Sequence, residues 1–142
     1  MAGPHISPRL TAVEPESGVG AARIGVSLAS LDSALAPALL KLRSGGSYAF
    51  GPLQVDVRAG SDGRVNWVAD YSAAATIDGH RLSQRFGRLR VALQSWKASF
   101  CGSSGDTQVL THGSSGLWTR IEFAGGHFQN LTVGRPNADP CL

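Results

Sequence analysis

Histidines and carboxylates are the side chains of this chain that could act in acid–base or metal chemistry, and they are widely scattered. The histidines show neither HxH nor HxxxH spacing, so no two of them share a strand or helix face by sequence alone. No spacing selects a pair of carboxylates as acid and base, and glycine-rich phosphate motifs and the GxSxG motif are missing. We therefore expect no catalytic residues, no metal site and no cofactor, and we predict that the chain is not an enzyme. The residues considered are His5, His80, His112, His127, Asp70, Asp78, Asp106 and Glu122.

A basic cluster is the strongest charge feature of the sequence, because no acidic residue lies within positions 79–105. We expect a strand here that runs to Phe100 from either Arg81 or Arg88. On such a strand Arg88 and Arg90 would share one face. This strip could bind a nucleic-acid backbone, a lipid head group or an acidic protein surface, or it could be an ordinary solvated face. Its members are Arg81, Arg85, Arg88, Arg90 and Lys97.

Aromatic residues form the second candidate site. If the strands close into a small barrel, four aromatic side chains could line a pocket for an apolar or anionic ligand. Packing in the core or across strands is the simpler explanation of Trp67 and Tyr71, and Trp96 could equally fill a core. The four are Trp67, Tyr71, Trp96 and Trp118.

Cys101 and Cys141 are the two cysteines, and the second lies one residue from the end of the sequence. A disulfide between them would hold the C-terminal tail and would require an oxidising environment. Two free thiols are the alternative. Without a CxxC spacing, a zinc site is not indicated.

The elements that must position these residues begin with a β-hairpin within residues 47–76. Alternating segments flank the turn at residues 60–63, Gly-Ser-Asp-Gly, and Asp-Gly favours such a turn. The alternation predicts one apolar face, because side chains on a strand point to opposite sides in turn. The residues expected on that face are Leu53, Val55, Val57, Val65, Trp67, Ala69, Tyr71, Ala73 and Ala75.

Further strands are expected around residues 107–111, 117–123 and 127–133, separated by glycine turns about every eleven residues. Leucines at near-helical spacing predict one short helix over residues 31–42, broken at Pro37. The fold predicted is mainly β: an antiparallel β-sandwich or small β-barrel with one short helix and an extended N-terminal arm.

Composition indicates one domain. The chain has 142 residues, 42% of them hydrophobic and only 16% charged, with 18 glycines and a net charge of +3. Such a length can bury a hydrophobic core, and few charges with many glycines suit a turn-rich β fold. We divide the chain into an extended arm (residues 1–20), a β-rich domain (21–134) and a C-terminal tail (135–142).

The leading functional hypothesis is a structural or assembly subunit, for example of a virion, a tail or a surface complex, that contacts its neighbours through arm and tail. A homo-oligomer or a larger protein assembly would then be its partner. The alternative is a small β-barrel binding module for an apolar or anionic ligand. Nucleic acid is a further possible partner, whereas the net charge alone is too small to imply it. No apolar run is long enough for a membrane helix and no signal-peptide h-region is present, so we expect synthesis in the cytoplasm and no membrane insertion.

Overall fold

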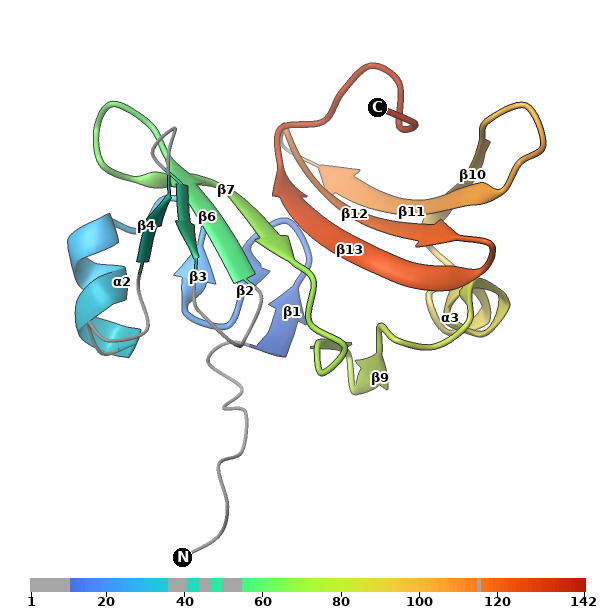
Figure 1. The fold of residues 1–142 in the computed structure, drawn as a ribbon, viewed down its shortest axis with the longest axis horizontal. Helices are drawn as coiled ribbons and strands as arrows, with labels where there is room; N and C mark the ends of the chain where they lie inside the picture. Colours follow the sequence, from blue (N-terminus) through green and yellow to red (C-terminus); the bar gives the residue numbers. More distant parts are fainter. Residues whose placement is uncertain (1–10, 36–40, 44–46, 50–54, 115) are drawn as a thin grey trace, which may run out of the picture.

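The computed structural model describes residues 11–35, 41–43, 47–49, 55–114 and 116–142 (Figure 1). It confirms the predicted mainly-β fold and shows a two-sheet, sandwich-like arrangement rather than a closed barrel. In the larger sheet the strand order is β10-β11-β12-β13-β7-β6-β5-β4, and all pairs are antiparallel. Its strands are β4 (Lys41–Arg43), β5 (Ser47–Ala49), β6 (Val55–Ala59), β7 (Val65–Asp70), β10 (Lys97–Cys101), β11 (Thr107–Ser114), β12 (Leu117–Ala124) and β13 (His127–Gly134).

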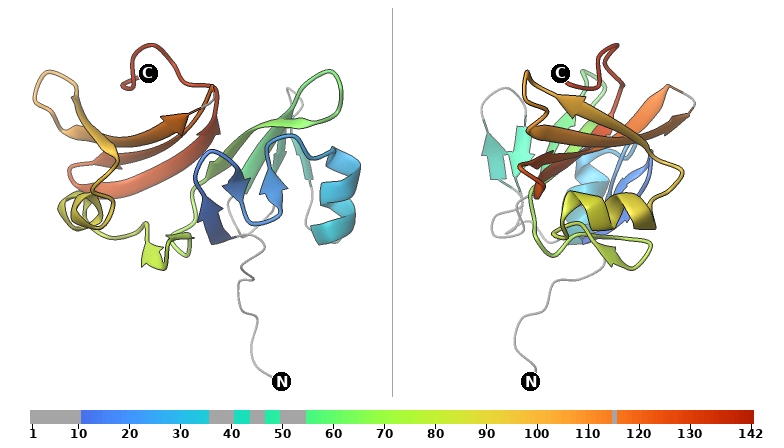
Figure 2. Two further views of the ribbon diagram at one scale, coloured as in Figure 1. Left: turned by 180° about the vertical axis from the view of Figure 1, so that it is seen from behind. Right: turned by 90° about the vertical axis from the view of Figure 1, so that its right-hand side faces the viewer.

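A smaller sheet with the order β3-β2-β1-β8-β9 packs against β7 of the larger one. Together with the helices it lies on one side of the large sheet, which curves across the whole molecule (Figures 1 and 2). We call this side of the large sheet the core face and the opposite side, on which the C-terminal tail lies, the tail face. The remaining elements are β1 (Ala12–Glu14), β2 (Gly18–Val19), β3 (Ala22–Arg23), β8 (Thr76–Ile77), β9 (His80–Arg81), α2 (Leu28–Leu35) and α3 (Phe86–Ala92).

The hydrophobic core joins both sheets and both helices. Apolar burial is the main favourable term in folding, and here valine, leucine and phenylalanine side chains from every large element contribute to one cluster. Its most buried members include Val19, Leu31, Val57, Val68, Leu89, Leu110, Ile121, Phe123, Leu131 and Val133.

The hairpin predicted around residues 60–63 is confirmed as β6 and β7, although Trp67 and Tyr71 are not buried on the apolar face predicted for them. The pairing register shifts between Arg58 and Ala59, where Asn66 is the extra residue on β7. Such a β-bulge reverses the alternation that follows it. Val65 and Val68 are therefore both buried, whereas Trp67 turns to the tail face.

The strand predicted to run to Phe100 is confirmed only over Lys97–Phe100, which lies in β10, and is wrong before that because residues 86–92 form the helix α3. Phe86, Leu89 and Leu93 recur at helical spacing and are buried. The same leucines also fit a period of two with Val91, and a short segment can satisfy both patterns. In the structure Val91 is 68% exposed, so the buried residues of this segment follow the helical period.

The N-terminal helix of the described residues, α2, ends at Leu35, whereas the prediction extended it to residue 42. Residues 41–43 are instead strand β4, paired antiparallel with β5. Pro37, at which a break was expected, lies outside the described residues, and so does Leu53 of the hairpin.

The segment assigned to an N-terminal arm contributes two strands to the small sheet. Val13 of β1 and Val19 of β2 are buried, and residues 1–10 lie outside the described residues. Gly18 has a φ of +150°, and a Cβ there would lie 2.1 Å from the Ala22 carbonyl oxygen. Glycine at this position therefore permits the close turn between β2 and β3.

Candidate functional site

The tail face of the large sheet carries a row of glycines and tryptophans that crosses four strands. Trp118 of β12 is paired with Gly113 of β11 on one side and with Gly134 of β13 on the other. Val133 is paired with Val68, so Gly134 lies beside Trp67 of β7. Adjacent strands are about 4.8 Å apart, and the backbones of the two tryptophans are therefore separated by roughly 10 Å, with no side chain between them.

The glycines are what make room for the indoles. A Cβ at Gly113 would lie 2.9 Å from the Cβ of Trp118, and one at Gly134 would lie 3.2 Å from Cδ1 of Trp67. On the far side of Trp67, the guanidinium of Arg58 lies 4.2 Å from the ring centroid, a cation–π contact. Both indoles remain half-buried, so part of each ring surface is open to a ligand.

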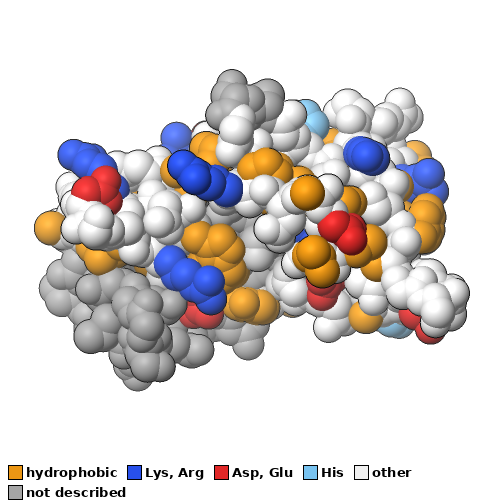
Figure 3. Space-filling model, turned by 90° about the horizontal axis from the view of Figure 1, so that it is seen from above, with side chains coloured by type: hydrophobic (Ala, Val, Ile, Leu, Met, Phe, Trp, Pro, Cys, Tyr) orange, Lys and Arg blue, Asp and Glu red, His pale blue; other side chains and the backbone are white. Residues whose placement is uncertain are grey.

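Three adjoining hollows follow this row, with volumes of about 600, 200 and 570 Å³. Trp118 and Asn137 line both the first and the second, and Trp67 and Arg135 line both the second and the third. We call the combined surface the tryptophan groove. In Figure 3, seen from the side on which the tail lies, hydrophobic and basic side chains lie next to each other across the middle of the molecule.

The charge of the groove is positive. The side chains of Arg135 and Lys97 line it and make no ion pair or hydrogen bond with other described residues, and no described Asp or Glu lines it. Arg120 also lines it but is engaged, because its guanidinium donates to the Pro140 carbonyl at 2.8 Å and forms an ion pair with Glu122 at 3.0 Å. The groove can therefore offer Arg135 and Lys97 to an anion.

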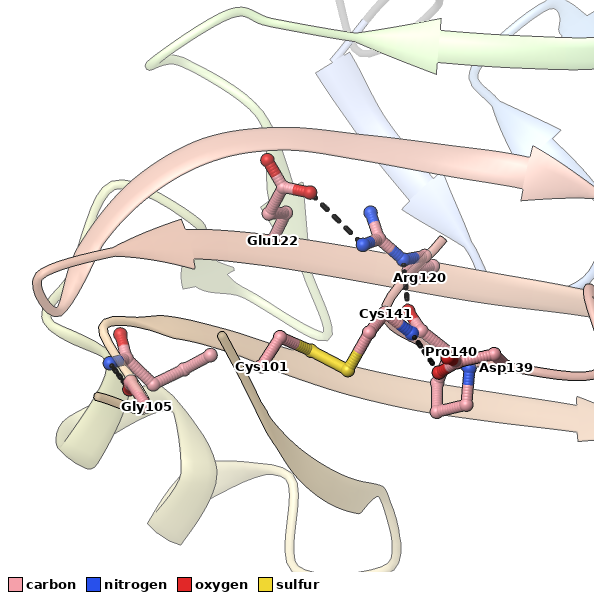
Figure 4. The surroundings of a disulfide bond; sticks show 8 residues. Cys101, Gly105, Arg120, Glu122, Asp139, Pro140 and Cys141 are labelled. Carbon is pink, nitrogen blue, oxygen red and sulfur yellow. Dashed lines mark hydrogen bonds and ion pairs between the residues drawn. A yellow bond between two sulfur atoms is a disulfide. The ribbon is translucent and has the colours of Figure 1, made fainter. Parts of the chain in front are cut away.

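The C-terminal tail forms one wall of the groove and is fixed to the sheet. A disulfide joins Cys101 of β10 to Cys141, with the two Cα atoms 5.5 Å apart (Figure 4). Asp139 caps the end of the tail by accepting a hydrogen bond from the Cys141 amide at 2.9 Å. Residues 135–142, which we expected to contact a neighbour, are thus tied to their own domain, and all but Pro140 remain exposed.

The four aromatic residues of the candidate pocket are not all brought together. Trp67 and Trp118 share the groove. Tyr71 follows β7 and is 42% exposed, and Trp96 is buried with its ring centroid 5.3 Å from that of His112. The sequence pattern did not separate Trp67 and Trp118 from Tyr71 and Trp96. Gly113 and Gly134, which lie opposite Trp118 on the neighbouring strands, are the signal that could have separated them.

The basic cluster is divided between several surfaces. Arg81 is in β9, Arg85 immediately precedes α3, Arg88 and Arg90 are on the helix and Lys97 begins β10. Two residues apart on a helix differ by about 200°, so Arg88 and Arg90 cannot share a face as they would on a strand. Arg90 instead lies over the rings of Phe86 and Phe100, at 5.9 and 5.7 Å.

Asp70 is a buried carboxylate that the sequence pattern placed on the polar face of the hairpin. The bulge turns it to the core face, where it is fully buried between Val55 and Leu131 of the neighbouring strands. Its Oδ1 accepts the Ser72 amide at 2.7 Å, and within the described residues its Oδ2 has no hydrogen-bond partner. Burial raises the pKa of the Asp70 carboxyl from 3.8 to about 7, and the bond from Ser72 opposes part of that rise.

Among the described residues no three His, Cys, Asp or Glu side chains lie close enough to share a metal ion. In the same part of the chain, no helix is both long and apolar enough to cross a bilayer. Comparison with protein-family models, with curated proteins and with solved structures found no match.

Proposed function

We propose that this chain is a non-catalytic binding module whose tryptophan groove holds a ligand with a planar ring and a negative charge. The observation that supports it is the row Trp118–Gly134–Trp67 beside the unpaired Arg135. Indole faces stack on flat rings, and a guanidinium attracts a phosphate or carboxylate. The open groove suits a ligand bound along a surface rather than one enclosed in a barrel.

A fluorescence titration tests this with three probes that separate ring from charge. Adenosine monophosphate carries both features, adenosine carries only the ring, and ribose 5-phosphate carries only the anion. We expect tryptophan quenching and the tightest binding with adenosine monophosphate. Because stacking contributes about 1–3 kcal/mol per ring, Trp67→Ala or Trp118→Ala should each weaken binding roughly five- to 150-fold.

Arg135→Gln should weaken binding of the two phosphates and leave adenosine unchanged, because it removes only the charge. Arg88→Gln, on the outer side of α3 and away from the groove, is the matched control and should change none of the three. Equal affinity for all three probes in the wild type and in the tryptophan variants would refute the proposal.

A second candidate is a structural subunit of a homo-oligomer or a larger protein assembly, as the sequence suggested. What favours it is an unpaired sheet edge: β10 is the last strand of the large sheet, and Phe100 on it is 57% exposed. Exposed edges with apolar side chains are typical sites of strand addition. In this proposal the sheet edge contacts a different protein of the assembly, and the N-terminal arm remains the candidate contact to a second copy of this chain.

A further inference from the structure

The free edge of β10 is a surface that the tryptophan groove does not use. Within the described residues β10 pairs only with β11, and no loop or side chain forms a hydrogen bond with its outer backbone groups. Each such edge presents a row of amide donors and carbonyl acceptors to an incoming extended chain. Main-chain hydrogen bonds would supply affinity in that mode, and neighbouring side chains would supply specificity.

The two faces of β10 differ in what they offer an added strand. Lys97, Ser99 and Cys101 point to the tail face, where Lys97 lines the groove and Cys101 holds the tail. The alternate residues Ala98 and Phe100 point toward α3, and the Phe100 ring lies edge-on to Phe86 at 5.7 Å. Side chains of an added strand would therefore meet apolar surface on one face and an ammonium group on the other.

Helix α3 completes the apolar side of this surface. Arg90 and Val91 lie on the flank of α3 that borders a shallow hollow of about 590 Å³ with Ala98 of β10. Val91 and Phe100 are 68% and 57% exposed, and they are two of the four large hydrophobic side chains exposed among the described residues. We call Arg90, Val91, Lys97, Ala98 and Phe100 the edge surface.

The positive charge of the edge surface indicates which kind of partner it binds. Arg90 contacts the rings of Phe86 and Phe100 and has no carboxylate partner among the described residues, and Lys97 has none either. The sequence contains no Asp or Glu within residues 79–105 that could neutralise them. We propose that the edge surface binds an acidic peptide segment in extended conformation, which adds to β10 as a further strand.

A second copy of this chain is a poorer occupant of the same edge. Pairing two β10 strands would set against each other two surfaces that both carry Arg90 and Lys97, and like charges across an interface are costly. An acidic peptide with alternating apolar residues instead matches the edge in backbone, shape and charge. This inference goes beyond the ligand proposed for the groove and uses a different surface, with Lys97 as the residue that borders both.

Fluorescence anisotropy with a labelled peptide of alternating glutamate and valine tests the proposal. We expect saturable binding that weakens as salt rises, and no binding of the matching lysine–valine peptide. Arg90→Glu should weaken binding at least about tenfold, because it replaces an attraction with a repulsion. Arg88→Glu is the matched control: it makes the same charge change on the outer side of α3 and should change affinity much less.

Two further measurements separate strand addition from simple charge attraction. Of two glutamate–valine peptides N-methylated on alternate residues, the one whose methyl groups face β10 should lose binding, and the other should keep it. Hydrogen exchange of the β10 amides should slow when the unmethylated peptide binds. Equal binding of both methylated peptides would overturn the proposal.

Other occupants give distinct results. If the chain self-associates and Phe100→Asp abolishes that association, a second copy holds the edge and the proposal fails. If a single-stranded oligothymidylate binds and Arg90→Glu removes it while the acidic peptide does not bind, the occupant is nucleic acid and the proposal also fails. The groove variants Trp67→Ala and Trp118→Ala should leave peptide binding unchanged. The groove proposal and the edge proposal can therefore fail independently of each other.

Discussion

Asp70 shows how the one extra residue of a β-bulge changes the pH dependence of stability. The bulge at Asn66 places this carboxyl at the junction of β6, β7 and β13 instead of in solvent. Desolvation disfavours its charged form, and among the described residues only the hydrogen bond from the Ser72 amide opposes this. The fold therefore holds Asp70 protonated at pH values where the unfolded chain has lost that proton.

Stability should consequently fall as pH rises from about 4 to about 7. Between the unfolded pKa of 3.8 and the folded pKa of about 7, the folded state binds one proton more than the unfolded state. Each pH unit in that window costs about 1.4 kcal/mol, so the total loss is at most roughly 4 kcal/mol and is complete above the folded pKa. Urea unfolding at several pH values measures it.

Asp70→Asn is the variant that isolates this effect, since an amide has the same shape and no charge to lose. It should flatten the change in the free energy of unfolding between pH 4 and 7, although the two N–H donors of the amide have no described acceptor, at a cost of about 1–3 kcal/mol. Asp62→Asn, in the exposed turn of the same hairpin, should keep the wild-type pH profile. An unchanged slope in the Asp70 variant would contradict the assignment.

For single residues, the sequence identified the candidate aromatic side chains but could not predict which of them lie together in the folded protein. Alternation placed Trp67 on the apolar face with Val65, and a single extra residue at Asn66 reversed that. A bulge has no sequence signature as firm as an Asp-Gly turn, because many residues tolerate its backbone conformation. The grouping of Trp67 with Trp118 also depends on the long-range pairing of β7 with β13, which no local pattern encodes.

Among the elements, the C-terminal tail depends most on a single covalent link. The Cys101–Cys141 disulfide closes a segment that contains β11, β12 and β13, with a sequence separation of 40. Constraining the unfolded chain in this way contributes about 2–4 kcal/mol. Replacing both cysteines by serine should lower the free energy of unfolding by that amount.

Unfolding of the wild type in reducing buffer provides the comparison. Reduced wild type and the double serine variant should unfold at similar denaturant concentrations, and only the wild type should respond to the reductant. The hydrogen bond from Arg120 to Pro140 should keep part of the tail in place, so adenosine monophosphate affinity should fall less than in Trp118→Ala. A wild type insensitive to reduction would show that the bridge contributes no stability.

Strands between glycine turns were predictable as elements, and α3 was not. β11, β12 and β13 lie where alternation placed them, because each is long enough for a period of two to exclude a period of 3.6. The seven residues of α3 span only two helical turns, and Leu89, Val91 and Leu93 fit a strand as well. The choice is made by packing, since the helix buries Phe86, Leu89 and Leu93 together and places the Phe86 ring 5.3 Å from that of Phe123 of β12.

At the scale of the whole molecule, two halves share one sheet through a short junction. β7 and β13 pair over three residues each, Val68–Asp70 with Leu131–Val133. A contact from the small sheet reinforces it, because the Glu16 amide donates to the Thr119 hydroxyl and the Glu16 carboxylate pairs with His112. The sequence indicated one domain of this size, but the position of the junction depends on pairing between distant strands.

The assembly hypothesis concerns the parts of the chain that could contact a neighbour. The large sheet leaves β10 as a free edge, and β1 and β2 hold the start of the described chain in the small sheet. If the chain is a homo-oligomeric subunit, light scattering after size-exclusion chromatography should give a multiple of 14.8 kDa. Arg90→Glu should leave that mass unchanged, since we assign the β10 edge to an acidic peptide and not to a second copy. Deleting residues 1–10, which spares β1, should reduce the mass to that of one chain if those residues contact the neighbour. A monomer at every concentration, together with rapid proteolysis confined to residues 1–10, would exclude the homo-oligomer and leave the binding module as the supported function.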